Sequence, residues 1–276
     1  MKWNLVDQML SRDIIEPAQG PWSSPVVLVK KKDGSTRFCV DFRKVNQVTK
    51  KDAQSLPRID DTLDTLGAAK WFSTLDLASG YWQVEVEQSD REKTAFSTPQ
   101  GLYQFRVMPF GLCNAPGTFQ RLMEHVLAGL HWTSCLVYLD DIIIFSQSIA
   151  DHLQKLREVF VRLQGAGLKI KPSKCFLMQR SVHYLGHVVS SEGVETDPKK
   201  VGCIQEWPTP KDVKELRQFL GLASYYRRFI KSFALETSPL YRLTEKGRWE
   251  WTKERGESCH IKANPSLRPN TSLPKL

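Results

Sequence analysis

The sequence lacks paired cysteines, a long apolar run and an apolar signal segment. Its six cysteines include no C-x-x-C pair and no neighbouring histidine at zinc-ligand spacing, so we expect reduced core thiols at Cys39, Cys113, Cys135, Cys175, Cys203 and Cys259. The most apolar stretch, Leu136 to Phe145, is interrupted by Asp140 and Asp141, and a mixed polar helix follows Met1. These absences argue against secretion and membrane spanning and predict an intracellular protein.

Acidic residues are also in deficit. The 276 residues contain 39 Lys plus Arg against 30 Asp plus Glu, a formal charge of +9 with a pI near 9.2. A basic surface suits a polyanionic partner such as nucleic acid, but surplus positive charge also serves solubility, so charge alone leaves both interpretations open. With 41% hydrophobic residues, the chain is long enough for one large or two modest domains with real cores.

The first part of the chain predicts a helix, a loop and a hairpin. Residues 1–13 alternate apolar and polar at helical spacing, and prolines then break the chain. The runs 26–29 and 37–40 favour strands, and Asp33-Gly34 between them favours a hairpin turn. We expect a further helix at about 58–66 and a strand at 71–77.

The middle of the chain mixes helix and strand patterns. Apolar residues recur at three and four over 115–130, which predicts an amphipathic helix. The β-rich runs 136–138 and 142–145 flank Leu139-Asp140-Asp141 and predict a tight hairpin, and a second helix is expected at 151–165. This order predicts an α+β fold in which an antiparallel sheet carries helices on one face.

The C-terminal part has a different character. Thr209-Pro210-Lys211-Asp212 offers an N-cap, an early proline and an acid, so we expect a helix from there to about Lys231. One side of that helix could lie against a nucleic-acid backbone or simply face solvent; it carries Arg217, Gly221, Ser224, Arg228 and Lys231. We divide the chain into residues 1–190, a helical subdomain at 191–251 and a disordered tail at 252–276.

Three aspartates stand where charge is unfavourable. Asp140 and Asp141 lie between two strongly apolar strands, and Asp76 lies near the end of another. If these strands are neighbours, the carboxylates form an oxygen-rich cluster of the kind that Mg²⁺ prefers. Two such ions about 3.5 to 4 Å apart support nucleotidyl transfer. The alternative is that Asp140-Asp141 is an ordinary hairpin turn and Asp76 a strand-end residue.

Beyond these patterns, Tyr138-Leu139-Asp140-Asp141 resembles the Y-x-D-D box of reverse transcriptases. Further segments resemble, in order and spacing, the polymerase part of gypsy-type (Metaviridae) LTR retrotransposon Pol polyproteins: Ser24 to Gly34 with Arg37 and Val40 to Arg43, Leu75 to Tyr81, Met108 to Gln120, Tyr184 to His187, and Phe219 to Phe229. The resemblance runs from about Met9 to Trp251.

This resemblance implies an RNA-directed DNA polymerase shaped like a right hand, with a palm, a fingers hairpin and a C-terminal thumb-like helical subdomain. The catalytic and metal-binding residues would be Asp76, Asp140 and Asp141, holding two Mg²⁺ ions or Mn²⁺ in their place. The residues that would contact the incoming dNTP are Lys31, Arg37, Tyr81, Phe110 and Gly111. The primer grip would be Leu185 and Gly186, and the residues that would contact nucleic acid are Arg217, Arg228 and Lys231.

The implied roles have physical support and plain alternatives. Lys31 and Arg37 suit phosphate, and Tyr81 suits a steric wall that screens out the ribose 2′-hydroxyl. Each residue also has a structural interpretation: solvated hairpin charges, a core aromatic, and a turn glycine at Gly111. Lys174 lies where the family has a basic residue near the active site, and it also suits a surface position.

The resemblance also implies partners and boundaries. We expect an RNA or DNA template with its primer, dNTPs and no membrane, in the cytoplasm, in virus-like particles or in the nucleus; a homodimer and a larger Pol polyprotein are both left open. Residues 255–276 lack the spaced acids of a ribonuclease H site, and the chain shows no protease D-T-G and no integrase-like zinc cluster, so we expect a fragment of a larger polyprotein or a truncated element-derived reading frame. An inactive nucleic-acid-binding remnant is the main alternative; Tyr81 argues against an RNA-templated RNA polymerase.

Overall fold

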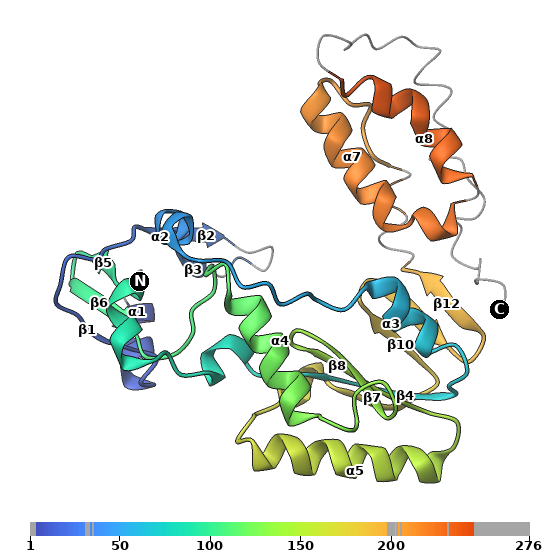
Figure 1. The fold of residues 1–276 in the computed structure, drawn as a ribbon, viewed down its shortest axis with the longest axis horizontal. Coiled ribbons are helices and arrows are strands. Elements are labelled where there is room, and N and C mark those ends of the chain that lie inside the picture. Colours follow the sequence, from blue (N-terminus) through green and yellow to red (C-terminus); the bar gives the residue numbers. More distant parts are fainter. Residues whose placement is uncertain are drawn as a thin grey trace. The chain divides into compact units, whose positions relative to one another are not determined.

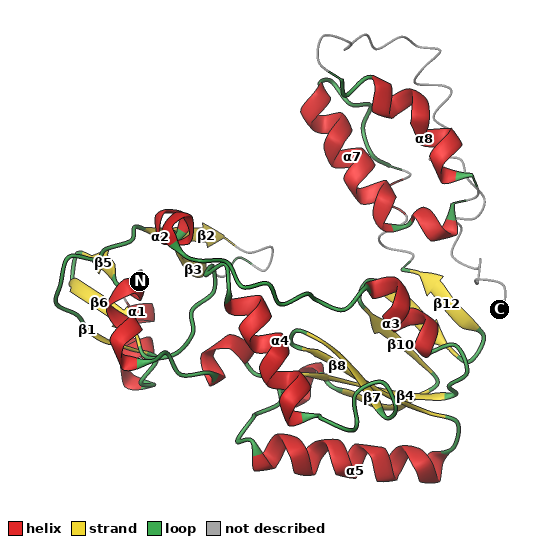
Figure 2. Ribbon diagram, viewed as in Figure 1, coloured by secondary structure: helices red, strands yellow, loops and turns green. Residues whose placement is uncertain are grey.

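Helices and strands are interspersed along the whole described chain, which gives the expected mixed α+β fold (Figures 1 and 2). The computed structural model describes residues 4–30, 34, 36–197, 202, 204, 206–230 and 232–245. The predicted tail at 252–276, Lys31, Lys231, Cys203 and Cys259 lie outside these residues. None of the described helices is both long and apolar enough to cross a bilayer.

The helices and strands have the following bounds. The α-helices are α1 (Asn4–Ser11), α2 (Arg43–Val48), α3 (Ile59–Thr65), α4 (Ala115–Val126), α5 (Ile149–Gly165), α7 (Val213–Tyr225) and α8 (Phe233–Arg242). The 3-10 helices are η1 (Gly80–Gln83), η2 (Gln88–Thr94), η3 (Pro172–Lys174) and η4 (Arg227–Phe229). The strands are β1 (Ile15–Pro17), β2 (Val26–Lys30), β3 (Thr36–Val40), β4 (Trp71–Asp76), β5 (Phe96–Thr98), β6 (Gly101–Phe105), β7 (Cys135–Tyr138), β8 (Asp141–Ser146), β9 (Phe176–Gln179), β10 (Ser181–Tyr184), β11 (His187–Ser190) and β12 (Gly193–Thr196).

The strands of the described residues form four sheets, and the chain forms two compact units. The sheets have the strand orders β1-β6-β5, β2-β3, β7-β8-β4-β9 and β10-β11-β12. The first unit contains the described residues up to Arg58, Thr74–Ile144 and Leu153–Phe176. The second contains Ile59–Ser73, Phe145–His152 and the described residues from Leu177 onward.

Aromatic rings fill one core of the first unit. Phe96 on β5 lies 5.3 Å from both Phe38 and Phe105, measured between ring centroids. The Phe38 pair is edge-on and the Phe105 pair is tilted, and such aromatic pairs stabilise a core beyond the area that they bury. The buried members of this cluster are Val6, Met9, Ile14, Ile15, Val40, Phe42, Phe96 and Phe105.

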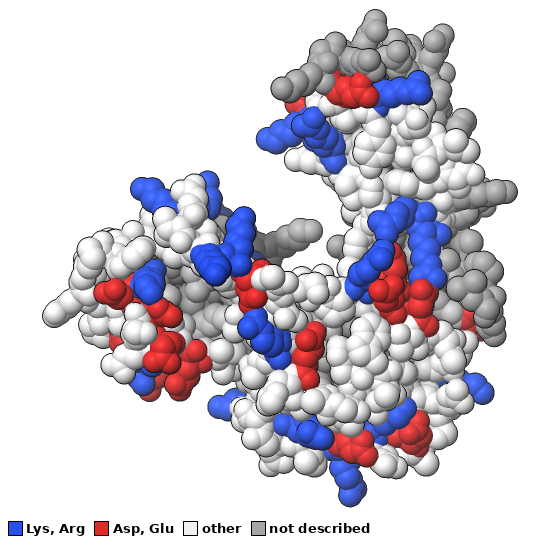
Figure 3. Space-filling model, in the orientation of Figure 1, with Lys and Arg blue, Asp and Glu red and all other residues white. Residues whose placement is uncertain are grey.

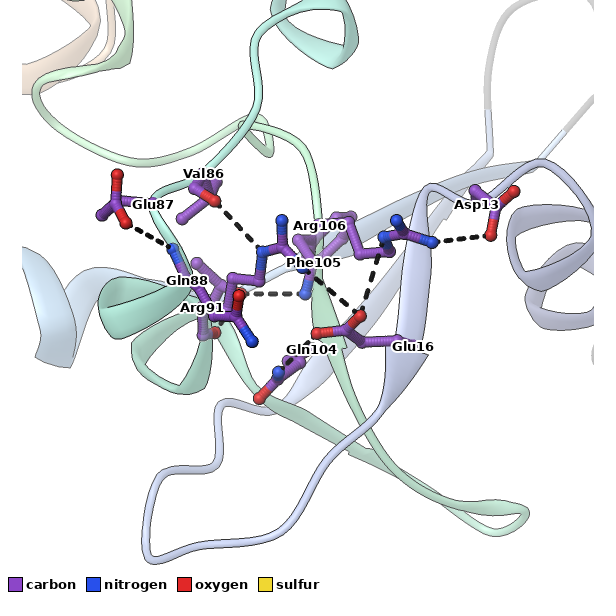
Figure 4. A network of polar contacts seen from close by, with 10 residues as sticks. Asp13, Glu16, Val86, Glu87, Gln88, Arg91, Gln104, Phe105 and Arg106 are labelled. Carbon is purple, nitrogen blue, oxygen red and sulfur yellow. Dashed lines mark hydrogen bonds and ion pairs between the residues drawn. The ribbon is translucent and has the colours of Figure 1, made fainter.

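Glu16 joins three segments at the edge of that core. It accepts a hydrogen bond from Gln104 (2.7 Å) and lies 3.5 Å from Arg91 Nη1 and 3.6 Å from Arg106 Nε (Figure 4). Arg106 also pairs with Asp13 at 2.7 Å. The network ties β1, β6 and η2 together. One carboxylate therefore holds the sheet β1-β6-β5 against η2, the 3-10 helix that precedes β5.

A buried hydrogen-bonded chain runs through the second unit. His152 is fully buried; its Nε2 lies 2.7 Å from the Ser73 hydroxyl and its Nδ1 lies 2.9 Å from the Ser146 hydroxyl. Ser146 donates to the Ser148 carbonyl, and Ser73 accepts from the Met178 amide. Because the Ser146 hydroxyl gives its proton to the Ser148 carbonyl, His152 donates to Ser146 through Nδ1.

Most of the predicted elements are present. The hairpins 26–40 and 135–146 and the helices near 58–66, 115–130 and 151–165 are confirmed, with the helix α4 ending at Val126 rather than near Leu130. The thiol prediction is confirmed for Cys135, whose burial raises its pKa to about 12. Cys39, Cys113 and Cys175 are free thiols as predicted, but they are only half-buried, so their predicted place in the core is wrong.

The predicted C-terminal helix is wrong at both ends. It begins after Asp212, not Thr209: the Asp212 carboxylate accepts from the Glu215 amide (2.7 Å), and Glu215 accepts in return from the Lys211 amide. Aspartate followed by an acid three residues later caps a helix better than threonine followed by proline does here, because both carboxylates find amides. The helix ends at Tyr225, well before Lys231, so the predicted basic face does not exist as one helical side.

Candidate active site

The turn that carries Asp140 is held by a buried glutamine. Tyr138 pairs with Asp141 across the β7–β8 hairpin, and Leu139 adopts a left-handed conformation with φ +54°. Gln120 on α4 is fully buried, accepts from the Leu139 amide (2.8 Å) and donates to the Val137 carbonyl (3.2 Å). One amide side chain therefore satisfies the backbone on both sides of Tyr138 and holds the start of the turn that carries Asp140.

Asp140 lies directly against Gly80. A Cβ added to Gly80 would come within 2.6 Å of the Asp140 Oδ1 atom and 3.0 Å of the Phe119 ring, so any other residue would displace the carboxylate. The same Oδ1 atom is buried and has no hydrogen-bond partner among the described residues. An orphaned carboxylate oxygen is costly, and it fits a site that a cation completes.

The three predicted carboxylates are electrostatically coupled. Burial raises the pKa of Asp140 to about 6, and the nearby charges of Asp141 and Asp76 act in the same direction. Burial and the charge of Asp76 also raise the pKa of Asp141. Lys174 on η3 opposes both shifts and forms an ion pair with Asp76 at 2.7 Å. The structure thus brings Asp76, Asp140 and Asp141 together around a single ammonium group.

The donor set fits a divalent cation, although it is not preassembled around one point. Carboxylate oxygens are the ligands that Mg²⁺ prefers, and the unpartnered Asp140 oxygen supplies one. Across the described ranges, no three acidic, histidine or cysteine side chains converge as a ready metal site. Lys174 holds the Asp76 carboxylate, so a cation would have to share or take over that contact.

An aromatic wall stands beside the carboxylates. The Tyr81 ring on η1 is buried between Phe110 (5.0 Å between centroids) and Phe119 (5.4 Å). Burial raises the pKa of Tyr81, and the charge of Asp140 adds to the shift. Phe110 is 51% exposed, so the wall presents an apolar face to solvent next to a negative cluster.

Asn46 holds the segment that presents Phe110. Its Nδ2 donates to the Gly111 carbonyl (2.8 Å) and its Oδ1 accepts from the Cys113 amide (2.9 Å). Gly111 has φ +101°, a conformation that favours glycine. Asn114, further along the same loop, accepts a hydrogen bond from the Asp52 amide and donates one to the Lys50 carbonyl. Two asparagine amides therefore fasten this loop to the segment that begins at α2.

Basic side chains gather over α2 and the β2–β3 hairpin on the face shown in Figure 3. Arg37 is exposed on β3, opposite Val29, and Lys31 lies outside the described residues. Arg43 forms a bidentate pair with Asp41, which lowers the pKa of that carboxyl to about 2. The exposed basic residues of this patch are Lys30, Arg37, Arg43, Lys44 and Lys50.

Known proteins identify this arrangement. The family model described as "Reverse transcriptase (RNA-dependent DNA polymerase)" matches residues 29–189, more than half of the chain. The chain belongs to the reverse transcriptases. It is 43% identical over 273 residues to the retrovirus-related Pol polyprotein from transposon opus of Drosophila melanogaster, and 41% identical over 271 residues to that from transposon gypsy of the same organism. These matches cover 97% and 96% of the chain, so the predicted kinship with gypsy-type Pol polyproteins is confirmed.

Solved structures agree with the sequence relatives. A foamy viral protease-reverse transcriptase in complex with double-stranded DNA matches with a TM-score of 0.87 and 27% identity over 95% of this chain and 47% of its own. The same viral protein in complex with an RNA/DNA hybrid matches with a TM-score of 0.81 and 26% identity over 94% of this chain and 35% of its own. The reverse transcriptase domain spans only 26% of the length of each of the two Pol polyproteins.

The remaining predicted contacts of the reverse transcriptase lie in the second unit. Leu185 and Gly186 form the β10–β11 turn, both with positive φ. Arg217 donates to the Thr244 carbonyl (2.9 Å), and Arg228 on η4 pairs with Asp64 on α3 (2.5 Å). Both arginines thus have intramolecular partners, and their proposed contact with nucleic acid stays a prediction, as does that of Lys231.

The sequence patterns predicted no backbone contact for Gln120 or Asn46, although the resemblance places Gln120 in the template- and nucleotide-positioning segment of the family. Gln120 interrupts the apolar face of an amphipathic helix, which is a signal that could have drawn attention to a buried amide. Asn46 offered no such signal in the sequence, because its partners lie 65 and 67 residues further along the chain.

Proposed function

We propose that this reverse transcriptase domain is a working RNA-directed DNA polymerase that extends a primer with dNTPs by a two-metal mechanism. The observation that carries the proposal is the gathering of Asp76, Asp140 and Asp141 with a buried, unpartnered carboxylate oxygen. A purely structural role for three mutually repelling carboxylates would leave their electrostatic cost unexplained. Divalent cations that accompany a polyanionic substrate would offset this cost.

The subdomains follow from the same proposal. The sheet β7-β8-β4-β9 would be the palm, and the β2–β3 hairpin would belong to the fingers, both within residues 1–190. Helices α7 and α8 would form the thumb-like subdomain at 191–251. This assignment is supported by the likeness to the foamy viral reverse transcriptase, whose match covers 95% of the chain.

Asp76, Asp140 and Asp141 would hold Mg²⁺, with Mn²⁺ as a substitute. When bound, the ions supply the positive charge that activates the primer 3′-hydroxyl and stabilises the leaving pyrophosphate. The chain itself contributes the orientation. Gln120 fixes the turn, Gly80 leaves room for the Asp140 carboxylate, and Lys174 neutralises Asp76 until substrate arrives.

The nucleotide would lie against the aromatic wall. Arg37 and Lys31 would contact the triphosphate, because a guanidinium and an ammonium both suit phosphate oxygens. Phe110 and Gly111 would line the sugar and base, and the packed Tyr81 ring would leave no space for a ribose 2′-hydroxyl. That exclusion favours deoxynucleotides and argues against an RNA-templated RNA polymerase.

The nucleic acid would be a primer annealed to an RNA or DNA template. The foamy viral structures hold double-stranded DNA in one case and an RNA/DNA hybrid in the other, and we extend both ligands to this domain. Leu185 and Gly186 would grip the primer, and Arg217, Arg228 and Lys231 would contact the backbone. The relatives are Pol polyproteins, so we place the activity inside the cell, in the cytoplasm, in virus-like particles or in the nucleus.

Primer extension tests the proposal. The chain is incubated with a DNA primer on an RNA template, dNTPs and Mg²⁺, beside the Asp140→Asn, Asp141→Asn double variant. We expect the double variant to lose at least about a hundredfold in rate, because removed transition-state charge stabilisation costs about that much for a single group. Asp61→Asn, an exposed change on α3, is the matched control and should leave the rate unchanged.

Two outcomes separate the alternatives. Folded wild-type protein that binds duplex but does not extend it would identify an inactive nucleic-acid-binding remnant. Extension with ribonucleotides as fast as with deoxynucleotides would contradict the role given to Tyr81.

A further inference from the structure

The turn between β10 and β11 is unusually constrained. Leu185 and Gly186 are its only two residues, since Tyr184 pairs with His187, and both have positive φ, +46° and +72°. Two left-handed residues are typical of the tight hairpin turn whose twist matches the strands. Glycine adopts this conformation readily, but leucine is disfavoured in it, so the surrounding structure must hold Leu185 in place.

Three donors converge on the two carbonyls of this turn. The Tyr225 hydroxyl and His187 Nδ1 (2.8 Å) both donate to the Leu185 carbonyl, and the Tyr226 hydroxyl donates to the Gly186 carbonyl (3.3 Å). The carbonyl can only accept, so His187 must carry its proton on Nδ1. Tyr225 and Tyr226 are the last residue of α7 and the one after it, 40 residues from the turn that they contact.

The donors are themselves packed as a block. The His187 ring stacks on Tyr225 (5.4 Å, 28°) and on Phe229 (5.5 Å, 30°), and Tyr225 meets Tyr226 edge-on at 4.9 Å. His187, Tyr226 and Phe229 are buried, and a Cβ on Gly186 would lie 3.5 Å from one hydroxyl and 3.6 Å from the other. We name Tyr225, Tyr226 and Phe229 the aromatic clamp.

Ion pairs anchor the aromatic clamp to α3. Arg227 pairs with Asp60 (2.8 Å) and Arg228 pairs with Asp64 (2.5 Å), and the two aspartates are four residues apart on one helix face. The residues between the two tyrosines and Phe229 therefore cannot shift without breaking both pairs. Hydroxyl, ring and ion-pair contacts all fix the same few residues.

The hydrogen bonds to the Leu185 carbonyl also determine the direction of the Gly186 N–H. In a planar trans peptide, the carbonyl of one residue and the N–H of the next point to opposite sides. Because Tyr225 and His187 hold the Leu185 carbonyl toward the aromatic clamp, the Gly186 N–H points away from it. Among the residues that the structure describes, that N–H has no acceptor.

We propose that the Tyr225 and Tyr226 hydroxyls are positioning groups for the primer grip: they hold the Leu185–Gly186 turn so that its free amide faces the phosphate backbone of the primer. The inference rests on the proposed function, because it takes the primer as the strand at this turn. The tyrosines act through the turn and do not touch the reacting atoms. Their effect should therefore fall on how well a bound primer end is placed.

Phenylalanine variants isolate the hydroxyls. Tyr225→Phe, Tyr226→Phe and the double variant keep the rings and the stacking but delete the hydrogen bonds to the turn. Tyr241→Phe is the matched control, because its hydroxyl bonds Ser224 in the same unit and does not reach the turn. Circular dichroism and thermal melting establish that each variant is folded.

Hydrogen exchange tests the clamp without any reference to activity. In the free protein, we expect the amides of the peptide spanning residues 184–188 to exchange roughly tenfold faster in the double variant, since each deleted hydrogen bond is worth a few-fold. The Tyr241→Phe control should match the wild type. Unchanged exchange in a folded double variant would overturn the clamp whether or not the chain is a polymerase.

Steady-state extension then tests the consequence. If the wild type extends a primer, the double variant should lose roughly tenfold in kcat with unchanged KM for dNTP and unchanged affinity for duplex. A change confined to dNTP KM, or an equal loss in Tyr241→Phe, would refute positioning of the primer. If the wild type extends nothing while exchange still responds, the proposed function fails and the clamp stands.

Discussion

At the scale of single residues, the Asp140 carboxylate lies against the Cα of Gly80 with one buried oxygen unpartnered. Asp141 and Asp76 repel it, so the folded chain without a cation carries an electrostatic cost at this point. Proteins tolerate such a cost where the charge acts on a ligand. Under the proposed function, local instability and activity would have the same origin at Asp140.

Asp140→Asn should stabilise the protein when divalent cations are absent. The amide has the same shape and removes a half-buried charge, so we expect unfolding in urea with EDTA to require about 1 kcal/mol more. Adding Mg²⁺ should raise the melting temperature of the wild type and of Asp61→Asn. It should not raise that of Asp140→Asn, because this variant lacks the carboxylate that binds the ion, and a ligand stabilises only a native state to which it binds. A destabilised Asp140→Asn protein would contradict this account.

Tyr81 gives a second prediction at this scale. Tyr81→Ala removes a ring packed between Phe110 and Phe119, and the discrimination against ribonucleotides should fall by at least about tenfold. Tyr81→Phe keeps the wall and should keep the discrimination. The ratio of kcat/KM for a dNTP and its ribonucleotide measures it, and equal ratios in the wild type and Tyr81→Ala would remove Tyr81 from this role.

At the scale of elements, loops are held by side chains from distant segments. Asn46 on α2 satisfies the backbone on both sides of Leu112, and Gln120 on α4 does the same on both sides of Tyr138, where the turn begins. Each side-chain amide bonds backbone groups that have no partner within a helix or sheet. It thereby attaches an irregular segment to the helix that carries the amide.

Asn46→Asp should loosen the loop that carries Phe110. The variant loses the donor to the Gly111 carbonyl and places a carboxylate beside it, so we expect about 1 kcal/mol lower stability in urea and faster hydrogen exchange over residues 110–113. Gln47→Glu adds the same charge to an exposed neighbour on α2 and should change neither quantity. Equal exchange in both variants would show that Asn46 does not hold the loop.

Sequence patterns located the elements that obey local rules. Periodicity found α4, α5 and the β7–β8 hairpin, and the chemistry of charged residues in apolar strands found Asp76, Asp140 and Asp141. The patterns missed interactions that depend on distant partners, such as the bonds from Gln120 to Leu139 and from Asn46 to Gly111, 19 and 65 residues apart. Helix α7 ends early for the same reason: Tyr225 and Tyr226 are engaged with a turn 40 residues away.

At the scale of the whole molecule, the net charge of +9 is distributed unevenly. Many acidic residues have a basic partner, as at Asp41, Asp60 and Asp64, whereas Lys30 and Lys44 lie exposed in the basic patch over α2 and the β2–β3 hairpin. Exposed surface cations release counterions from nucleic acid on binding, which makes affinity depend on salt.

Duplex affinity should therefore fall linearly on a plot of log K against log salt. The double variant Lys30→Gln, Lys44→Gln should reduce the slope by up to about 2, roughly one for each phosphate that is no longer neutralised. Lys93→Gln is the control, because Lys93 is already paired with Asp90. Fluorescence anisotropy over a salt series measures the slope, and an unchanged slope in the double variant would place the phosphates elsewhere.

The buried chain through Ser73, His152 and Ser146 has a consequence for how this protein evolves. At one end the Ser146 hydroxyl donates to a backbone carbonyl, at the other end the Ser73 hydroxyl accepts from a backbone amide, and the His152 ring joins the two hydroxyls. A mutation of His152 removes this hydrogen bond from both buried hydroxyls, and a mutation of either serine removes it from one ring nitrogen of His152. We therefore expect related proteins either to keep Ser73, His152 and Ser146 or to replace all three together.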